Sequence, residues 1–280
     1  MIKNILFGII AVSFIIGGSA MANAKSLSNK WDKVFPKSEK VNVQKVEFKN
    51  RFGITLVGDL YTPKTMKDND KLPAIAISGP FGAVKEQSSG LYAQTLAERG
   101  FMTLAFDPSY TGESSGTPRN VASPDINTED FSSAVDYLSV NKNADPNKIG
   151  ILGICGFGGF AINAAAIDTR IKATVASTMY DMTRVSAKGY NDSVDENARF
   201  EMKQNLNKQR TEDFKNGNYK GADGLPEHLT GNEPQFVKDY WGYYKTKRGF
   251  HARSINSNGK WNMTSSLSLI NQPILQYAPE

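Results

Sequence analysis

The single cysteine of the chain, Cys155, lies where an apolar run gives way to glycines. Residues 148–154 are predicted to form a buried strand, and a helix is predicted over about 158–166. A sharp turn between a strand and a helix lifts a Ser or Cys side chain clear of the sheet and presents backbone N–H groups beside it. Most free cysteines are small buried core residues. The surrounding glycines instead favour a nucleophile that attacks a carbonyl carbon.

A second segment could supply another part of the same site. Residues 80–83 follow a predicted buried strand at 73–78, so their backbone N–H groups are expected at the carboxyl edge of the sheet, where open α/β folds bind ligands. With the N–H of Gly156 they could form an oxyanion hole; the alternative is a plain Gly-Pro turn. The helix after Cys155 would lower the thiol pKa from its usual value of about 8.5.

The elements around these segments alternate between strand and helix. Residues 43–61 alternate apolar and polar side chains around Asn50–Gly53, which indicates a β-hairpin. Strands are then predicted at 73–78, 101–106 and 172–177 and before Cys155, with helices at 89–99 and 128–140 and a turn at Asp145–Asn147. This order predicts one α/β domain over residues 25–280 with a mostly parallel sheet.

Beyond about residue 180 the sequence becomes more polar. Residues 192–209 are helix-prone, residues 215–229 are loop-like, and the late apolar run Leu267–Ile270 does not indicate a core strand. We expect a helical lid over about residues 180–265. Its aromatic side chains are interpreted as packing rather than as a substrate platform; they are Trp241, Tyr243, Tyr244, Phe250 and Trp261.

The N-terminus and the composition limit the class of protein. Residues 1–24 contain Lys3, an apolar run and Ala22-Asn23-Ala24, the pattern of a secretory signal. The apolar run is shorter than the roughly 20 residues of a membrane span. We therefore expect an exported protein, periplasmic or secreted, without a stable membrane anchor. The net charge of +5 is too small an excess to indicate nucleic-acid binding, and no feature fixes an oligomeric state.

Three segments together carry a resemblance to a known family. They are Gly79-Pro80-Phe81-Gly82-Ala83-Val84-Lys85-Glu86-Gln87, residues 107–119 and the Cys155 turn. In order and spacing they resemble the exported, dienelactone-hydrolase-like branch of the α/β-hydrolases, over about residues 40–280. The resemblance implies an α/β-hydrolase fold and hydrolysis of an ester, lactone or similar acyl bond in a small-molecule substrate, without a metal or cofactor. It places the second oxyanion donor at Phe81 or Gly82.

The resemblance also implies an acid and a histidine that activate the nucleophile. Asp181 follows the predicted strand at 172–177 and is a candidate acid, although an ordinary turn residue fits as well. The two histidines, His228 and His251, lie in polar, loop-like sequence. His251 is a candidate base, but both are expected at the surface. Residues 107–119 are expected to shape the pocket floor or to cap a helix.

Two departures from the family pattern lead to further expectations. The chain resembles a member that lacks its last two strands, so activity is expected to be impaired and the strand at 172–177 should lie at an open edge. The second glycine of the turn pattern is replaced by Phe157. This ring is expected to press against the neighbouring strand or to require a slightly different turn.

Two other classes of protein fit parts of the sequence. A non-catalytic remnant or small-molecule-binding protein of the same fold would keep the pocket but not the chemistry. A dinucleotide-binding domain would use Gly156-x-Gly158-x-x-Ala161 as its fingerprint and Asp181 as a ribose ligand. The upstream hairpin and the two earlier strand-helix units are unlike a domain that begins with its fingerprint.

Overall fold

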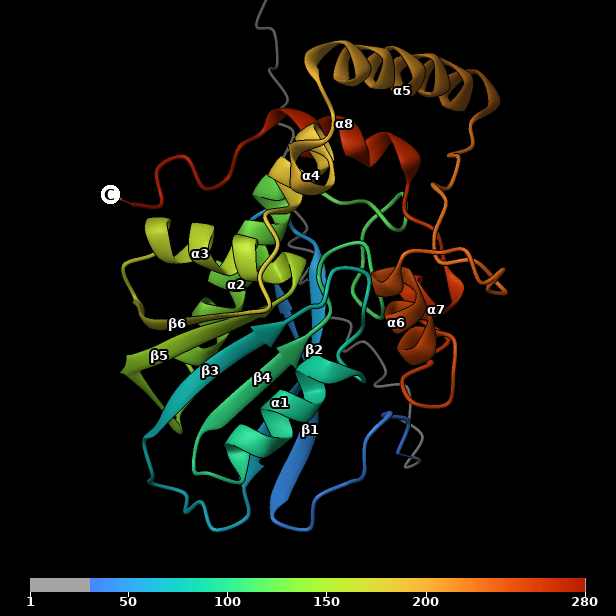
Figure 1. Cartoon of the computed structure of the whole chain (residues 1–280). Helices are drawn as coiled ribbons and strands as arrows, with labels where there is room; N and C mark the ends of the chain where they lie inside the picture. The colour runs from blue at the N-terminus through green and yellow to red at the C-terminus, as the bar shows by residue number, and fades with distance from the viewer. Residues whose placement is uncertain (1–30, 280) are drawn as a thin grey trace, which may run out of the picture. The chain divides into compact units, whose positions relative to one another are not determined.

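A computed structural model describes residues 31–279 of the chain. The predicted secretory signal lies outside these residues. The strands are β1 (Val41–Lys49), β2 (Thr55–Pro63), β3 (Leu72–Ser78), β4 (Met102–Phe106), β5 (Ala144–Ile154) and β6 (Ile171–Ser177). The helices between them are α1 (Ser88–Ala97), α2 (Pro124–Ser139) and α3 (Gly156–Ile167). Figure 1 shows this alternation of strand and helix along the chain.

The six strands form one sheet in the order β1-β2-β4-β3-β5-β6. The predicted hairpin is confirmed, since β1 pairs with β2 in antiparallel fashion. β2 pairs antiparallel with β4, and the β4-β3, β3-β5 and β5-β6 pairs are parallel. The sheet is therefore mixed and mostly parallel, as the sequence predicts, and the carboxyl ends of β3, β4, β5 and β6 meet at one edge.

Alternate side chains of β3 pack against different helices. Ala74 and Ala76 belong to a core cluster with Phe131 of α2 and Phe160 of α3. Ile75, between them, lines a groove with Leu96 of α1. Because successive strand residues point to opposite faces, α2 and α3 cover one face of the sheet and α1 covers part of the other. The core between the sheet and the pair α2 and α3 supports the turn that carries Cys155.

β6 lies at the edge of the sheet, as expected for the strand at 172–177. Its middle residues are exposed, and Val175 retains 52% of its accessible surface. Within the described residues no further strand covers it.

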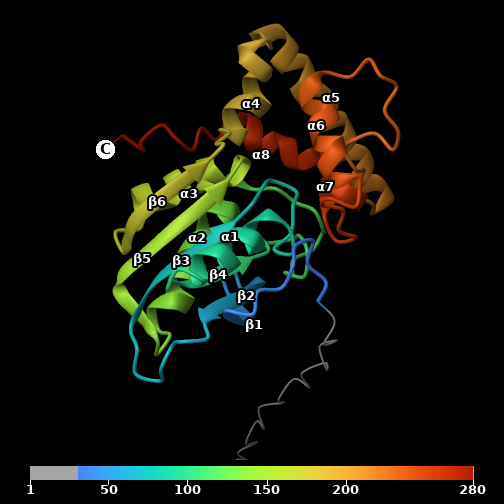
Figure 2. The ribbon, with the colours of Figure 1, turned by 60° about the horizontal axis from the view of Figure 1, so that its bottom comes forward.

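The residues after β6 form helices. They are α4 (Met182–Lys188), the 3-10 turn η1 (Tyr190–Asp192), α5 (Glu196–Asn216), α6 (Gln235–Tyr244), α7 (Ile255–Asn258), the 3-10 turn η2 (Met263–Ser265) and α8 (Ser266–Asn271). Figures 1 and 2 show them grouped on one side of the sheet. Within residues 31–279, every helix is too short or too polar to span a lipid bilayer.

Two predicted boundaries are wrong for local reasons. α2 begins at Pro124 rather than at residue 128, because Pro124 occupies the first helical position, where its missing N–H costs nothing. The predicted turn at Asp145–Asn147 lies inside β5. The register jumps there, since Leu72 pairs with Ala144 and Ala74 pairs with Ile149. These residues therefore interrupt the pairing without ending the strand.

Candidate active site

Cys155 occupies the sharp turn between β5 and α3. Its backbone has φ 57° and ψ −124°, a left-handed conformation that is costly for any residue with a side chain. Neighbouring segments hold it there: its N–H donates to the Ser177 carbonyl at 2.9 Å, and its carbonyl accepts from the N–H groups of Gly158 at 2.9 Å and Tyr180 at 3.0 Å. The turn is thus fixed by the end of β6 and the segment that follows it.

The Phe157 ring is accommodated without pressing on a strand. It is 1% exposed and packs among Phe81, Phe131 and Phe160, with ring centroids 5.3–6.4 Å apart. Gly79, at the end of the neighbouring strand, leaves the space: a Cβ built there would lie 2.8 Å from the Phe157 Cβ. The expected clash is therefore relieved by the absence of a side chain at Gly79.

Two backbone N–H groups face the sulfur of Cys155. They belong to Gly156, at the start of α3, and to Phe81, in the turn after β3, and both act to lower the pKa of the thiol. Of the two donors that the sequence leaves open, Phe81 is the one at the sulfur. Gly82 is held from the other side, since its carbonyl accepts from the Asn256 N–H at 3.1 Å and the Ser254 hydroxyl at 2.9 Å.

Burial has the largest effect on the pKa of the Cys155 thiol. Burial raises the pKa of Cys155 above its ordinary value, and Gly156, Phe81 and the Tyr240 hydroxyl offset this only in part. The pKa of Tyr240 is also raised, first by burial and then by its hydrogen bond with Tyr180. Tyr240 therefore stays protonated at neutral pH, and its hydroxyl acts to lower the pKa of the thiol. The N–H of Gly156 at the start of α3 acts to lower the thiol pKa, as expected for a helix N-terminus, but burial outweighs it.

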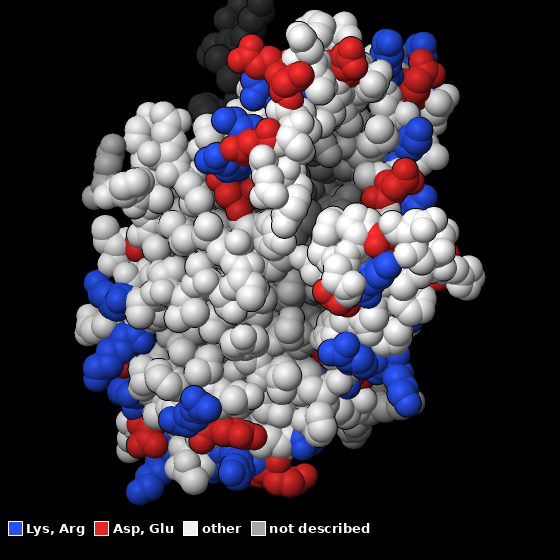
Figure 3. Space-filling model, in the orientation of Figure 1, with Lys and Arg blue, Asp and Glu red and all other residues white. Residues whose placement is uncertain are grey.

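A cavity of about 670 Å³ opens above the thiol. Its wall combines the turn after β3, the Cys155 turn and the helices that follow β6. The lining residues are Pro80, Phe81, Cys155, Thr178, Tyr180, Met182, Val185, Tyr190, Leu225, Phe236, Tyr240, Tyr244 and Asn256. None of them carries a charge. Figure 3 shows a mostly uncharged surface between α4 and α6, with acidic and basic side chains around it.

Asp181 is engaged as a helix cap. Its Oδ1 accepts from the backbone N–H groups of Thr183 and Arg184, both at 3.0 Å, and from the Thr183 hydroxyl at 2.6 Å. These bonds satisfy the first free N–H groups of α4. The structure therefore places Asp181 as the turn residue that the sequence offered as the alternative to a catalytic acid, and it does not line the cavity.

Neither histidine lines the cavity. His228 is exposed in the loop before α6, as expected. The expectation for His251 is wrong, because His251 is only 9% exposed. Its Nδ1 accepts from the Arg253 N–H at 3.3 Å. Burial lowers the pKa of His251, and the charges with the largest effect on it are those of Glu86 and Arg253.

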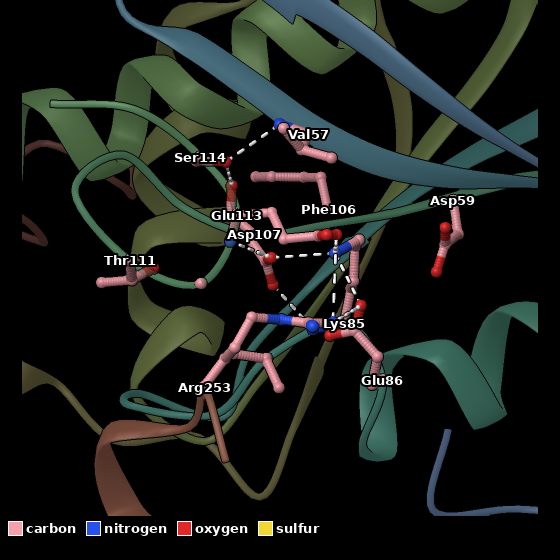
Figure 4. A network of polar contacts seen from close by, with 12 residues as sticks. Val57, Asp59, Lys85, Glu86, Phe106, Asp107, Thr111, Glu113, Ser114 and Arg253 are labelled. Atoms are coloured by element: carbon pink, nitrogen blue, oxygen red, sulfur yellow. Dashed lines mark hydrogen bonds and ion pairs between the residues drawn. The ribbon is translucent and has the colours of Figure 1, made fainter. Parts of the chain in front are cut away.

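His251 borders a buried cluster of charges around Lys85, which we call the Lys85 cluster (Figure 4). The Lys85 ammonium is fully buried and lies 2.7 Å from Glu86, 3.0 Å from Asp107 and 2.5 Å from Glu113. Arg253 lies 2.7 Å from Glu86 as well. Burial alone would lower the pKa of Lys85, but these carboxylates hold it above its ordinary value.

The cluster also corrects the expectation for residues 107–119. Asp107 accepts from the backbone N–H groups of Lys85 at 2.8 Å and Glu113 at 2.9 Å. The Ser114 hydroxyl donates to the Asp107 carbonyl at 2.6 Å. No residue of this segment lines the cavity. The segment therefore neither forms the pocket floor nor caps a helix; it fixes the turn after β3.

Among residues 31–279, no three His, Cys, Asp or Glu side chains are grouped so that they could bind a metal ion.

The glycines of the dinucleotide fingerprint contact protein atoms. A Cβ at Gly156 would lie 2.6 Å from Met182, and a Cβ at Gly158 would lie 2.9 Å from Met179. They allow close packing of the segment after β6, and Asp181 is occupied as a helix cap.

The aromatic face of α6 is the part of the cavity that the sequence reasoning missed. Phe236, Tyr240 and Tyr244 are spaced four residues apart and share one helix face. That period is visible in the sequence and could have identified them. Of the aromatics expected to serve as packing, Trp261 does so, stacking on Phe81 at 4.2 Å, whereas Tyr244 lines the cavity.

Comparisons with known proteins agree with this architecture. The sequence pattern of the dienelactone hydrolase family matches residues 58–180, which include both Phe81 and Cys155. The uncharacterized protein PA2218 of Pseudomonas aeruginosa is 59% identical over 254 residues, covering 91% of this chain and 68% of that protein. A crystal structure of PA2218 superposes with a TM-score of 0.87, covering 90% of this chain and 78% of that one.

Two further relatives are more distant. The uncharacterized protein YcjY of Escherichia coli K12 is 35% identical over 206 residues, covering 73% of this chain and 67% of YcjY. Thiohydrolase aneE of Aspergillus aculeatus is 33% identical over 139 residues, covering 50% of this chain and 42% of that protein. With the fold and the position of Cys155, these likenesses show that the chain belongs to the dienelactone-hydrolase-like branch of the α/β-hydrolases.

Proposed function

We propose that this protein is a thiol-dependent acyl hydrolase in which Cys155 is the nucleophile. The observation that carries the proposal is the set of groups around the sulfur: a strained turn, two backbone N–H donors and an open cavity. The substrate class is an ester, lactone or thioester. The name of the relative aneE, a thiohydrolase, is consistent with an acyl bond of this kind.

The proposed reaction has two stages. In the first, the Cys155 sulfur attacks the carbonyl carbon, the carbonyl π electrons move to oxygen, and the N–H groups of Phe81 and Gly156 bind the resulting oxyanion. The C–O or C–S bond then breaks, and the leaving group takes up the proton lost by the thiol. In the second stage, water attacks the acyl-cysteine, the acid is released, and the thiol is restored.

The rate of this reaction should be low. A general base typically contributes about a hundred- to ten-thousand-fold, and neither histidine of the chain lines the cavity. The raised pKa of Cys155 also keeps the thiolate scarce at neutral pH. We therefore expect activated esters to acylate Cys155 slowly and the acyl-cysteine to accumulate.

The test uses p-nitrophenyl hexanoate. Nitrophenolate release and intact mass are followed for the wild type, Cys155→Ala and Cys155→Ser. We expect one hexanoyl adduct on the wild type and none on Cys155→Ala, with turnover far below the roughly 10 s⁻¹ of a typical enzyme. Rapid turnover that depends on Cys155 would contradict the expected low rate. It would mean that another group in the protein acts as the general base.

A second candidate function is binding of acyl compounds without hydrolysis. The raised thiol pKa and the positions of the two histidines favour it. It predicts that p-nitrophenyl hexanoate binds equally to the wild type and to Cys155→Ala and that no adduct forms on either.

We also infer that the protein acts outside the cytoplasm, because residues 1–24 carry the pattern of a secretory signal. A mature protein beginning at residue 25 in the periplasm or the medium would support export. Full-length protein retained in the cytoplasm would contradict it.

A further inference from the structure

The wall of the Cys155 cavity is built from helices that turn their apolar faces inward. On α4, Met182 and Val185 face the cavity. Arg184 faces outward and pairs with Asp192 at 2.5 Å, and Ala187 and Lys188 line a separate surface hollow on the other side. The charges of α4 are therefore directed away from the thiol.

α6 is divided in the same way. Phe236, Tyr240 and Tyr244 face the cavity, and neighbouring rings along this face lie 6.1 and 6.5 Å apart. Tyr190 extends the row by stacking on Phe236 at 5.9 Å. Lys238 and Asp239 bond elsewhere, to the Gly231 carbonyl at 2.7 Å and to Gln235 at 2.9 Å. One side of the cavity is thus a continuous aromatic surface.

The polar groups of the wall are hydroxyls and an amide rather than charged groups. The Asn256 amide donates to the Phe81 carbonyl at 2.9 Å. Burial raises the pKa of Tyr240 and Tyr244, so both hydroxyls are neutral at pH 7. A bound ligand therefore meets apolar surface beyond the reacting atoms and no cation that could pair with an anionic group.

We propose that this cavity selects an uncharged, mainly apolar acyl group and excludes acyl groups that end in a carboxylate. This inference rests on the proposed function for its reacting group, but it concerns binding and can be tested without turnover. Each methylene removed from water should raise kcat/KM about fourfold until the cavity is filled. An unpaired carboxylate in the same place should lower it by more than about a hundredfold.

The test compares two esters of equal chain length. One is p-nitrophenyl hexanoate, and the other is the mono-p-nitrophenyl ester of adipic acid, which carries a carboxylate in place of the terminal methyl group. Both are assayed with the wild type for kcat/KM, and both are titrated calorimetrically into Cys155→Ala, which lacks the proposed nucleophile. The expected result is a strong preference for the hexanoate ester in both assays.

A variant of α4 provides the matched comparison. Val185→Lys introduces a cation into the wall. It should raise the ratio of kcat/KM for the adipate ester to kcat/KM for the hexanoate ester at least tenfold. Ala187→Lys introduces the same cation on the outer face of the same helix and should leave the ratio unchanged. If Val185→Lys does not fold, the two esters on the unaltered wall still decide the question.

The outcomes separate the two proposals. Selective binding of the hexanoate ester without an adduct would support this inference and overturn the hydrolytic function. Turnover that requires Cys155 but accepts both esters equally would overturn this inference alone. Failure of the hexanoate ester to bind Cys155→Ala would also overturn it.

Discussion

The turn after β3 joins two regions of opposite electrostatic character. Pro80 and Phe81 line the uncharged cavity, whereas Lys85 and Glu86, a few residues later, belong to the Lys85 cluster. A second segment divides in the same way, since Arg253 pairs with Glu86 and Asn256 lines the cavity. Charge is thus concentrated where it fixes the two segments and is absent where a ligand would bind.

The two regions depend differently on their polar groups. In the Lys85 cluster, buried charges compensate one another, so removing one partner leaves buried charge that is only partly compensated. In the cavity, the polar groups are hydroxyls and amides whose single bonds contribute modestly. Substitutions in the cluster should therefore affect folding, and those in the cavity should affect the chemistry of the thiol.

The largest expected effect is that of Lys85→Met. It leaves Glu86 and Asp107 without their shared cation and should lower the free energy of unfolding by about 3–5 kcal/mol. Met182→Leu, a volume-conserving change in the cavity wall, should lower it by less than about 1.5 kcal/mol. Urea denaturation measures both. An equal loss of unfolding free energy in the two variants would show that the Lys85 cluster does not contribute more to stability than the cavity wall.

The next effect concerns the pH dependence of the thiol. Because burial raises the pKa of Cys155, the neutral thiol predominates at pH 7, and the reactive thiolate becomes the major form only above the ordinary pKa of about 8.5. The rate of alkylation by iodoacetamide should rise about tenfold per pH unit from pH 7 and level off above pH 8.5. Levelling off below that value would show an activated thiol instead.

The smallest effect is that of Tyr240→Phe. The variant removes the hydroxyl that acts to lower the pKa of the thiol, and losing a contribution of the size of one hydrogen bond should slow alkylation at pH 8 about three- to tenfold. Tyr243→Phe, in the same helix but outside the cavity lining, serves as the control and should not change the rate. A faster reaction in Tyr240→Phe would mean that the hydroxyl does not stabilise the thiolate.

The turn around Cys155 could be predicted because its signals are local. An apolar strand, a turn and a helix lie within about twenty residues, and the glycines mark the close contacts. The Lys85 cluster could not be predicted in this way, because Asp107 and Glu113 lie 22 and 28 residues from Lys85 and no spacing rule links them. The polar sequence neighbours of His251 predict a surface position, whereas His251 is only 9% exposed and one of those neighbours, Arg253, pairs with the buried Glu86.

The bonds that join Phe81 and Gly82 to residues 254–256 have a consequence for how the protein is made. The Asn256 amide and the Phe81 carbonyl are separated by 175 residues, and contacts of such long range form late because closing the intervening chain is entropically costly. A ribosome-bound chain could complete the strands up to β6 while the Phe81 turn still lacked its support. The groups that surround the thiol would then come together only after residue 256 has emerged, so the Cys155 turn would form before the site around it is complete.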